Sequence, residues 1–353
     1  MAVIHSVGTA TPSYSFTQAD IKSIVSSLVI DPRLRRFLSV FDQTDIANRH
    51  FVVHPQFFEK TRSFGERNEL FQKSGVDLAL EAVQKCFDNQ NQIDPSAIDA
   101  IISVTSTGVL TPTLDAELIN RFGINEQSVR MPFFGLGCAG GASGLARAYD
   151  YLKAHPTHSV LLVTTELASI AFHPDHFTPK DIVGAALFAD GAAAVILLGK
   201  DHSCRTDKHE YQLSGTSSRL KTDTMDLMGW EIKDDGFFVI FSKEIPQLID
   251  SFWKNHLDEF LFSNQLELGE ITHFLAHPGG KKILNEMEKI LDSDQHVDFS
   301  KQVLNQYGNM SSATVLFVLE KFLNANHLAM KGKQIITALG PGFSSELILM
   351  ERV

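Results

Sequence analysis

The sequence predicts an α/β protein built from two similar halves, and two observations lead to this prediction. Short apolar runs typical of buried strands alternate with amphipathic helical patterns over most of the chain. Two features also recur at a spacing of 171 residues: a strand pattern that ends in glycine, at Gly108 and Gly279, and a small-residue run before an apolar helix, at Cys138 and Asn309. Such a repeat is expected to bring the starts of two buried helices together.

In the first half, apolar runs predict three buried strands, Ala97–Val104, Ser159–Thr164 and Gly191–Leu198. Ser128–Phe134, before the glycine-rich segment, is a plausible further strand. Before the first of these strands, Val76–Phe87 repeats apolar residues with helical periodicity, which predicts an amphipathic helix. These elements are assigned to an N-terminal half of residues 1–200.

The second half shows the same kinds of element. Ile271–Ala276 and Glu346–Met350 predict buried strands, and Lys281–Leu291 predicts an amphipathic helix. Residues 201–235 are polar and rich in turn-forming residues, so we expect them to connect the halves. The C-terminal half then comprises residues 201–353.

The composition is that of a globular protein. Of the 353 residues, 44% are apolar and 21% are charged, which excludes a disordered or fibrous chain. The formal charge of −11 and the lack of a segment dense in Lys and Arg argue against nucleic acid as the main partner. A small anionic substrate remains compatible with this balance, because a local basic cluster can bind it.

The cysteines and the N-terminal residues of the sequence indicate the cellular compartment in which the protein is expected. The three cysteines are too scattered for a disulfide framework, and none forms the C-x-x-C pair of a zinc or redox site. Most of the histidines, including His173 and His176, are expected in polar turns, so no metal site is predicted. The chain does not begin like a signal peptide and has no apolar run of membrane-spanning length, so we expect a cytoplasmic protein without membrane insertion.

A glycine-rich segment, Gly135–Gly140, admits two interpretations. It satisfies G-x-G-x-x-G, the phosphate loop of dinucleotide-binding folds, which would indicate an NAD(P)-dependent oxidoreductase. That fold needs an acidic residue about 20 positions later, whereas the first acid on the next strand, Glu166, comes late. The second interpretation is a nucleophilic cysteine, Cys138, at the mouth of a helix whose dipole would lower the pKa of the thiol.

Two polar residues of the second half favour the nucleophile, although each has a plain structural alternative. His277 directly follows a buried strand, and Pro278 keeps the backbone extended there. Asn309 precedes an apolar helix, where it is either a helix N-cap or an amide that points at a substrate oxygen. Cys138 alone is equally compatible with a buried structural cysteine.

Four motifs in register carry a resemblance to a known family. Cys138, HPGG at 277–280, GNMSSA at 308–313 and GPGF at 340–343 resemble the type III polyketide synthases, the chalcone-synthase-like branch of the thiolase fold. The resemblance implies a five-layered αβαβα body of two pseudo-symmetric halves, a homodimer, and chemistry on acyl-CoA and malonyl-CoA without a metal or redox cofactor. It also implies that Cys138, His277 and Asn309 form a catalytic triad.

The resemblance extends to the substrate pocket, with departures. Phe188 matches a phenylalanine that gates the cavity, and Ser311 matches a residue lining it. The second gating phenylalanine is replaced by Val239, so a one-sided gate is expected, and Ala168 and Ala171 replace threonines of the starter pocket. Because these residues are smaller, we expect a larger cavity, a medium or long fatty acyl starter, and an alkylpyrone or alkylresorcinol product.

The CoA-binding residues match the family less well. Arg36 fits one of the basic positions that contact CoA, and Gly279 and Gly280 lie where the resemblance places the CoA site, but Ser39 and Gln43 replace two further basic residues. Arg33, Arg35 and Lys60 are alternative phosphate ligands or ordinary surface charges.

Two other functions remain open within the same fold. A ketoacyl-ACP synthase III uses the same residue types, but its histidine is followed by Gln-Ala-Asn, whereas His277 is followed by Pro278-Gly279-Gly280. A non-catalytic scaffold of this fold would have no use for a complete Cys, His and Asn set.

Overall fold

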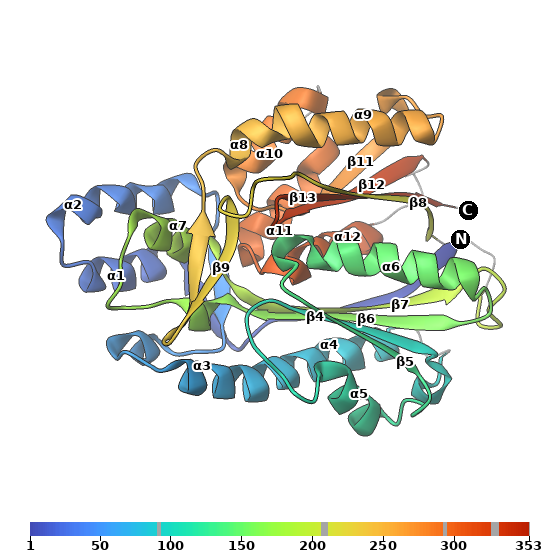
Figure 1. Ribbon diagram of the computed structural model, residues 1–353, viewed down its shortest axis with the longest axis horizontal. Coiled ribbons are helices and arrows are strands. Elements are labelled where there is room, and N and C mark those ends of the chain that lie inside the picture. Colours follow the sequence, from blue (N-terminus) through green and yellow to red (C-terminus); the bar gives the residue numbers. More distant parts are fainter. Residues whose placement is uncertain (90–92, 206–210, 292–294, 326–331, 353) are drawn as a thin grey trace.

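The computed structural model describes residues 1–353 except 90–92, 206–210, 292–294, 326–331 and 353. Its secondary structure is organised in five layers, helix, sheet, helix, sheet, helix (Figure 1). The outer layers contain α4 (Val76–Asp88) and α5 (Leu114–Phe122) on one side and α9 (Lys254–Ser263) and α10 (Lys281–Leu291) on the other, with α6 (Gly140–Ala154) and α12 (Thr314–Asn324) in the middle. The five-layered fold expected from the resemblance is confirmed.

The two sheet layers are the ends of one continuous sheet of nine strands. The strand order is β11-β12-β13-β8-β1-β7-β6-β4-β5. The strands are β1 (Ala2–Ala10), β4 (Ala100–Thr105), β5 (Val129–Phe134), β6 (Ser159–Leu167), β7 (Asp190–Gly199), β8 (Tyr211–Leu220), β11 (Ile271–Ala276), β12 (Lys333–Gly340) and β13 (Ser344–Arg352). Only a short register, from Ala2↔Leu213 to Ile4↔Tyr211, joins β1 to β8 and so links the two layers.

The strand directions repeat in the two halves. In the first half β4 and β6 are parallel, while β6–β7 and β7–β1 are antiparallel. In the second half β11 and β12 are parallel, while β12–β13 and β13–β8 are antiparallel. The pseudo-symmetry predicted from the internal repeat is therefore present, and β5 is an extra edge strand of the first half.

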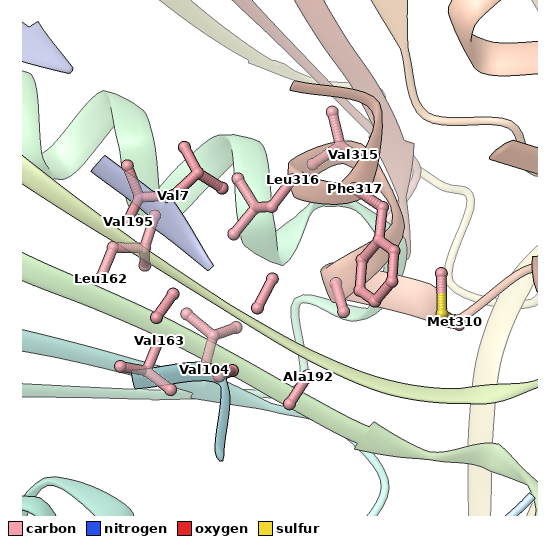
Figure 2. Close-up of a cluster of buried hydrophobic side chains, with 14 of the residues drawn as sticks. Val7, Val104, Leu162, Val163, Ala192, Val195, Met310, Val315, Leu316 and Phe317 are labelled. Carbon is pink, nitrogen blue, oxygen red and sulfur yellow. The ribbon is translucent and has the colours of Figure 1, made fainter. Parts of the chain in front are cut away.

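The core fills the spaces between the layers. Both β6 and β7 are buried along their whole length, as expected for strands covered on two faces. Figure 2 shows Val104, Leu162 and Val195 of the sheet together with Leu316 and Phe317 of α12. A second cluster, around Trp253 and Phe274, lies in the C-terminal half.

Shorter elements surround one end of the sheets. They are α1 (Gln18–Leu28), α2 (Pro32–Arg35), α3 (Phe64–Leu70), α7 (Pro179–Leu187), α8 (Ile245–Leu248), α11 (Asp298–Tyr307), β2 (Tyr14–Thr17), β3 (Asn48–Phe51), β9 (Met228–Lys233) and β10 (Gly236–Phe241). The hairpin β9–β10 forms a separate two-stranded sheet and stands beside α7 (Figure 1).

The prediction that residues 201–235 are only a connection is wrong, because β8 and β9 lie within them. The segment of β8, YQLSGTSSRL, is rich in Ser and Thr, which also occur in turns, but Thr is favoured in strands. The prediction that His173 lies in a polar turn is also wrong, because His173 is buried and stacks on Phe238 of β10. Within the described residues, no helix has both the length and the apolar character needed to cross a membrane.

Candidate active site

Cys138 lies in a short 3₁₀ turn, Gly137–Ala139, that leads from β5 into α6. Gly137 has a φ of 49°, and a Cβ there would lie 2.8 Å from the Pro341 side chain. A Cβ on Gly140 would lie 2.6 Å from Cγ1 of Val104. The glycines around Cys138 are thus needed for the turn and for close packing of the helix, which accounts for the G-x-G-x-x-G pattern without a dinucleotide.

His277 and Asn309 come from the second half. His277 directly follows β11, and its backbone N–H donates to the carbonyl oxygen of Thr337 over 2.7 Å. Asn309 is held beside Phe188 by a strand-like bridge, in which the Asn309 N–H donates to Leu187 and the Asn309 carbonyl accepts from Ala189.

The Asn309 side chain is oriented by two backbone groups. Its Oδ1 accepts from the N–H of Ser311 over 2.8 Å, and its Nδ2 donates to the carbonyl of Gly279 over 3.2 Å. The Sγ of Cys138 lies 3.9 Å from the same Oδ1. Asn309 is therefore not the N-cap of α12, which begins at Thr314, and its amide faces the sulfur.

One mostly apolar cavity unites these groups. Cys138, His277, Asn309 and Ser311 all line it, together with Gly279. The cysteine, histidine and asparagine are only 8%, 3% and 1% exposed. Folding thus gathers a thiol, an imidazole and a carboxamide from distant parts of the chain around a single enclosed space.

Burial controls the protonation of the two titratable groups. It raises the pKa of the Cys138 thiol to about 12, although hydrogen bonds between the thiol and the Ser311 and Asn309 side chains act in the opposite direction. It lowers the pKa of His277 to about 3, and within the described residues neither ring nitrogen has a hydrogen-bond partner. The expectation of a lowered thiol pKa is wrong, because loss of hydration outweighs the hydrogen bonds to the sulfur.

A buried carboxyl group that sequence reasoning did not assign lies next to the nucleophile turn. Glu166, at the end of β6, accepts from the hydroxyls of Thr107 over 2.8 Å and Ser312 over 2.6 Å. It also accepts from the N–H of Ser106, whose hydroxyl accepts from the N–H of Gly137. Burial raises the pKa of Glu166 to about 7. This network links Ser106, Thr107 and Gly137 of the first half to Ser312 of the second half, next to Cys138.

The aromatic residues that line the cavity differ from those expected. Phe188 and Val239 both line the cavity, and Val239 lies opposite Trp230 in the register of β9 and β10. The indole of Trp230 packs on the Phe188 ring with the centroids 5.8 Å apart and the planes at 41°. The one-sided gate inferred from Val239 is therefore corrected, since the second aromatic ring comes from the facing strand.

The backbone of Phe188 is held in place by a buried arginine. Arg49, which is fully buried, donates to the carbonyl oxygens of Phe188 and Ala185 and to Oε1 of Gln18. Burial lowers the pKa of Arg49 to about 9. No short sequence motif pointed to this role.

Ala168 and Ala171 do not line the cavity of Cys138. They line a neighbouring cavity, which shares only Phe188, Trp230 and Val239 with the first. The residues expected to form one pocket thus belong to two.

Of the residues considered for CoA binding, only some lie at the cavity of Cys138. Gly279 lines the cavity, and a Cβ on Gly280 would touch Leu187 instead. Arg36 is exposed, its guanidinium lies 4.9 Å from the ring centroid of Phe37, and it lines neither cavity. Among the described residues, no group of three His, Cys, Asp or Glu side chains is arranged to hold a metal ion.

Comparison with known proteins gives full-length matches. The family model described as chalcone and stilbene synthases, N-terminal domain, matches residues 1–202, and the corresponding C-terminal domain matches residues 212–353. A protein of Bacillus subtilis (strain 168), described as a putative chalcone synthase, is 37% identical over 358 residues that cover 99% of this chain and 98% of that protein.

Two further proteins are similar over their length. A 1,3,6,8-tetrahydroxynaphthalene synthase of Streptomyces peucetius subsp. caesius is 33% identical over 350 residues, covering 98% of this chain and 92% of that protein. The crystal structure of the C-terminal type III polyketide synthase domain of Steely1, a type I/III hybrid from Dictyostelium, superposes with a TM-score of 0.91. It is 27% identical and covers 100% of this chain and 99% of that domain.

Proposed function

Because this chain belongs to the chalcone and stilbene synthase family and is a type III polyketide synthase, we propose that Cys138, His277 and Asn309 are its catalytic residues. The observation that supports this assignment is their common position around one buried, largely apolar cavity. We propose further that the halves 1–200 and 201–353 divide the work, the first supplying the nucleophile and the second the groups that stabilise charge.

The first step is loading of an acyl group from a CoA thioester. Neutral His277 accepts the proton of the Cys138 thiol, and the thiolate attacks the thioester carbonyl. The C–S bond to CoA breaks, and the CoA thiolate takes the proton from His277. Burial lowers the pKa of His277, so its imidazole is neutral at neutral pH and carries a ring nitrogen that can accept a proton.

The second step is decarboxylation of malonyl-CoA. Loss of CO₂ leaves an enolate whose oxygen carries the new negative charge, and N–H groups of His277 and Asn309 donate hydrogen bonds to that oxygen. Asn309 Nδ2 has one hydrogen on the Gly279 carbonyl, which leaves the other for the substrate. The apolar walls disfavour the carboxylate relative to neutral CO₂.

The third step forms the carbon–carbon bond. The enolate carbon attacks the thioester on Cys138, the sulfur leaves, and a β-ketoacyl-CoA results. Decarboxylation supplies the carbanion, and the three steps together involve no net oxidation or reduction. We therefore propose that the reaction needs neither a metal nor a redox cofactor.

For the substrates, we propose a fatty acyl-CoA starter, extension with malonyl-CoA, and an alkylpyrone or alkylresorcinol product. The apolar side chains around both cavities support this choice. Arg36, with its exposed guanidinium, is our proposed contact for a CoA phosphate, and Gly279 and Gly280 allow the thioester arm to approach the backbone.

We also propose that the protein is a homodimer. The edge strand β5 exposes Val129 and Phe134, which are 45% and 52% exposed, and the nearby Val109 is 42% exposed. An apolar sheet edge of this kind is suited to pairing with a second copy of the chain. The cytoplasmic location stays a prediction.

The test is to incubate the purified protein with malonyl-CoA and a panel of acyl-CoAs and to identify the products by mass spectrometry. We expect acylation of Cys138 and release of pyrones or resorcinols, and no acylation in Cys138→Ala. A wild-type protein that is acylated by no acyl-CoA would refute the proposal. Extension with malonyl-ACP but not malonyl-CoA would instead identify a ketoacyl-ACP synthase.

A further inference from the structure

The end of helix α7 lies where Phe188 and Asn309 meet. The last bond within this helix runs from the N–H of Phe188 to the carbonyl oxygen of Gly184, so the carbonyl groups that follow need partners from elsewhere. One of them, that of Leu187, accepts from the N–H of Asn309 over 2.9 Å. The position of the Asn309 backbone is therefore tied to the position of this helix end.

The other carbonyl groups of the helix end are bound by side chains from two distant segments. Arg49 of β3 donates through Nη1 to the carbonyls of Ala185 and Phe188, the latter over 3.0 Å. Gln18, the first residue of α1, donates to the carbonyl of Ala186 over 2.9 Å, and its Oε1 accepts from Nη2 of Arg49 over 2.6 Å. Every carbonyl from Ala185 to Phe188 thus has a hydrogen-bond partner.

The stem of the Arg49 side chain also contacts the backbone that precedes Asn309. A Cβ on Gly308 would lie 2.8 Å from Cγ and 2.9 Å from Cδ of Arg49, and the φ of 71° at Gly308 favours glycine there. Arg49 thus touches both the end of α7 and the segment that carries Asn309. Loss of this side chain is expected to move the Asn309 amide relative to Cys138.

Arg49 does not reach the substrate itself. Its side chain is fully buried and lines neither cavity. Burial lowers the pKa of Arg49 to about 9, while the Asp190 carboxylate acts in the opposite direction, so the guanidinium is a cation at neutral pH. The partial negative charge at the C-terminal end of a helix stabilises a cation placed there. Arg49 can therefore act on the reaction only through the groups that it holds.

We propose that Arg49 is a positioning residue for Asn309 and that it keeps the Asn309 amide in place for the decarboxylation of malonyl-CoA. This inference rests on the proposed function. Without the guanidinium, two carbonyls of the helix end lose their donor, and the backbone that holds Asn309 shifts as they find new partners. Cys138 and His277 are held by other elements, the turn before α6 and the end of β11, so acyl loading depends far less on Arg49.

The test measures two reactions of each variant: release of CO₂ from malonyl-CoA, and acylation of Cys138 by octanoyl-CoA, followed by intact-protein mass spectrometry. In Arg49→Met we expect kcat of decarboxylation to fall by about 10–100-fold with little change in KM, because the amide is misplaced and not removed. Acylation should fall by less than about threefold. Arg49→Lys keeps the charge but not the planar fork of donors, so its decarboxylation rate should lie between those of Arg49→Met and the wild type.

A combination of substitutions separates positioning from general damage. If Arg49 acts through the Asn309 amide, Arg49→Met should change decarboxylation by less than about twofold in a protein that already carries Asn309→Ala. Equal losses in the two backgrounds overturn the proposal, and so do equal losses of decarboxylation and acylation in Arg49→Met. The matched control is Arg121→Met, which replaces an exposed arginine in the last turn of α5, and both of its rates should equal those of the wild type.

Folding of each variant is checked by circular dichroism. If Arg49→Met does not fold, Arg49→Lys and Gln18→Ala decide, because both weaken the hold on the helix end and should lower decarboxylation more than acylation. A wild type that is acylated by no acyl-CoA and does not decarboxylate malonyl-CoA refutes the proposed function and this inference with it. A wild type active in both reactions, with folded Arg49 variants whose two rates are unchanged or fall equally, refutes only the role of Arg49.

Discussion

His277 and Asn309 line the same cavity as Cys138 but are held in different ways. The Asn309 amide is tied to Ser311 and Gly279, so its orientation is set before any substrate binds. The imidazole of His277 lacks a hydrogen-bond partner within the described residues, although it is almost completely buried. A buried polar group of this kind is costly unless a ligand completes it, which suits a group that must exchange a proton with substrates.

Replacement of Asn309 tests the assignment at the decarboxylation step. Asn309→Ala removes one donor to the enolate oxygen, so malonyl-CoA decarboxylation should fall by about 10²–10³, while acylation of Cys138 persists. Decarboxylation is measured by CO₂ release and acylation by intact-protein mass spectrometry. Asn120→Ala, which removes an exposed amide of α5, is the control. Normal decarboxylation by Asn309→Ala would contradict the role.

Replacement of Glu166 tests the buried carboxyl. Its pKa of about 7 in the folded protein exceeds the ordinary value of 4.5, so the folded state holds the proton more tightly than the unfolded state. Stability from this group is therefore present below pH 4.5 and is lost as the pH rises to about 7, by up to about 3 kcal/mol.

The measurement is urea denaturation of the wild type and Glu166→Gln at several pH values. The stability of the wild type should decline relative to that of the variant between about pH 4.5 and 7 and then level off. Comparison with the variant cancels other titrating groups, such as Asp190. A constant difference across this range would show that Glu166 titrates normally.

Among single residues, the sequence motifs located the thiol, the imidazole and the amide, and the fold brings them to one cavity. Trp230 and Glu166 were not predicted, for a physical reason. Trp230 reaches the cavity only through the register of a hairpin, and Glu166 bonds residues distant in sequence, so neither leaves a local pattern. The protonation of Cys138 was mispredicted because the degree of burial depends on the whole fold.

Helix α6 depends on glycine for its close packing. It packs so closely on the start of α12 and on β6 that a Cβ on Gly141 would lie 2.3 Å from the carbonyl oxygen of Ser312, and one on Gly144 would lie 2.4 Å from Cδ1 of Leu162. Since Cys138 lies in the turn that leads into this helix, the packing also fixes the depth of the sulfur.

Gly141→Ala should therefore destabilise the protein by about 2–3 kcal/mol and reduce acylation of Cys138, because backbone atoms must move apart. Gly65→Ala, in helix α3, is the matched control, since its Cβ would meet nothing closer than 3.9 Å. The control should be neutral or stabilise by about 0.5 kcal/mol. Both are measured by denaturation, and equal effects of the two substitutions would contradict the packing argument.

The buried strands and amphipathic helices that were predicted lie within a few residues of the observed ones. A strand covered on both faces is apolar along its length, and an amphipathic helix carries one apolar stripe, so both leave a clear sequence pattern. Ile271–Ala276 and Lys281–Leu291 match the structure at both ends. The elements not assigned from the sequence include β1, β8, β12 and the hairpin β9–β10. In β8, β9 and β10, partial exposure mixes polar and apolar residues and weakens the pattern.

On the scale of the whole molecule, the internal spacing of 171 residues correctly indicated two halves. It holds from β4 to β11, whose ends are both offset by this amount, but α6 and α12 begin 174 residues apart. Cys138 lies inside its 3₁₀ turn, whereas Asn309 precedes the turn Ser311–Ala313. The repeat thus predicted the architecture but not the different placement of the two side chains.

Assembly is tested at the edge strand β5. Phe134→Lys places a charge in the proposed interface, so the affinity of the dimer should fall at least about tenfold, or about 1.4 kcal/mol. Analytical ultracentrifugation measures the change. Ile30→Lys, at a residue that is 87% exposed and lies after α1, is the control and should remain dimeric. A wild type that sediments as a monomer would contradict the proposed dimer.

The position of β1 has a consequence for biosynthesis. This apolar strand emerges from the ribosome long before its partners, β7 and β8, which begin at Asp190 and Tyr211. At roughly 5–20 residues per second, the nascent segment waits about 10–40 s before it can pair. The chain therefore depends on the exit tunnel, on chaperones or on transient contacts to shield its opening residues from aggregation during translation.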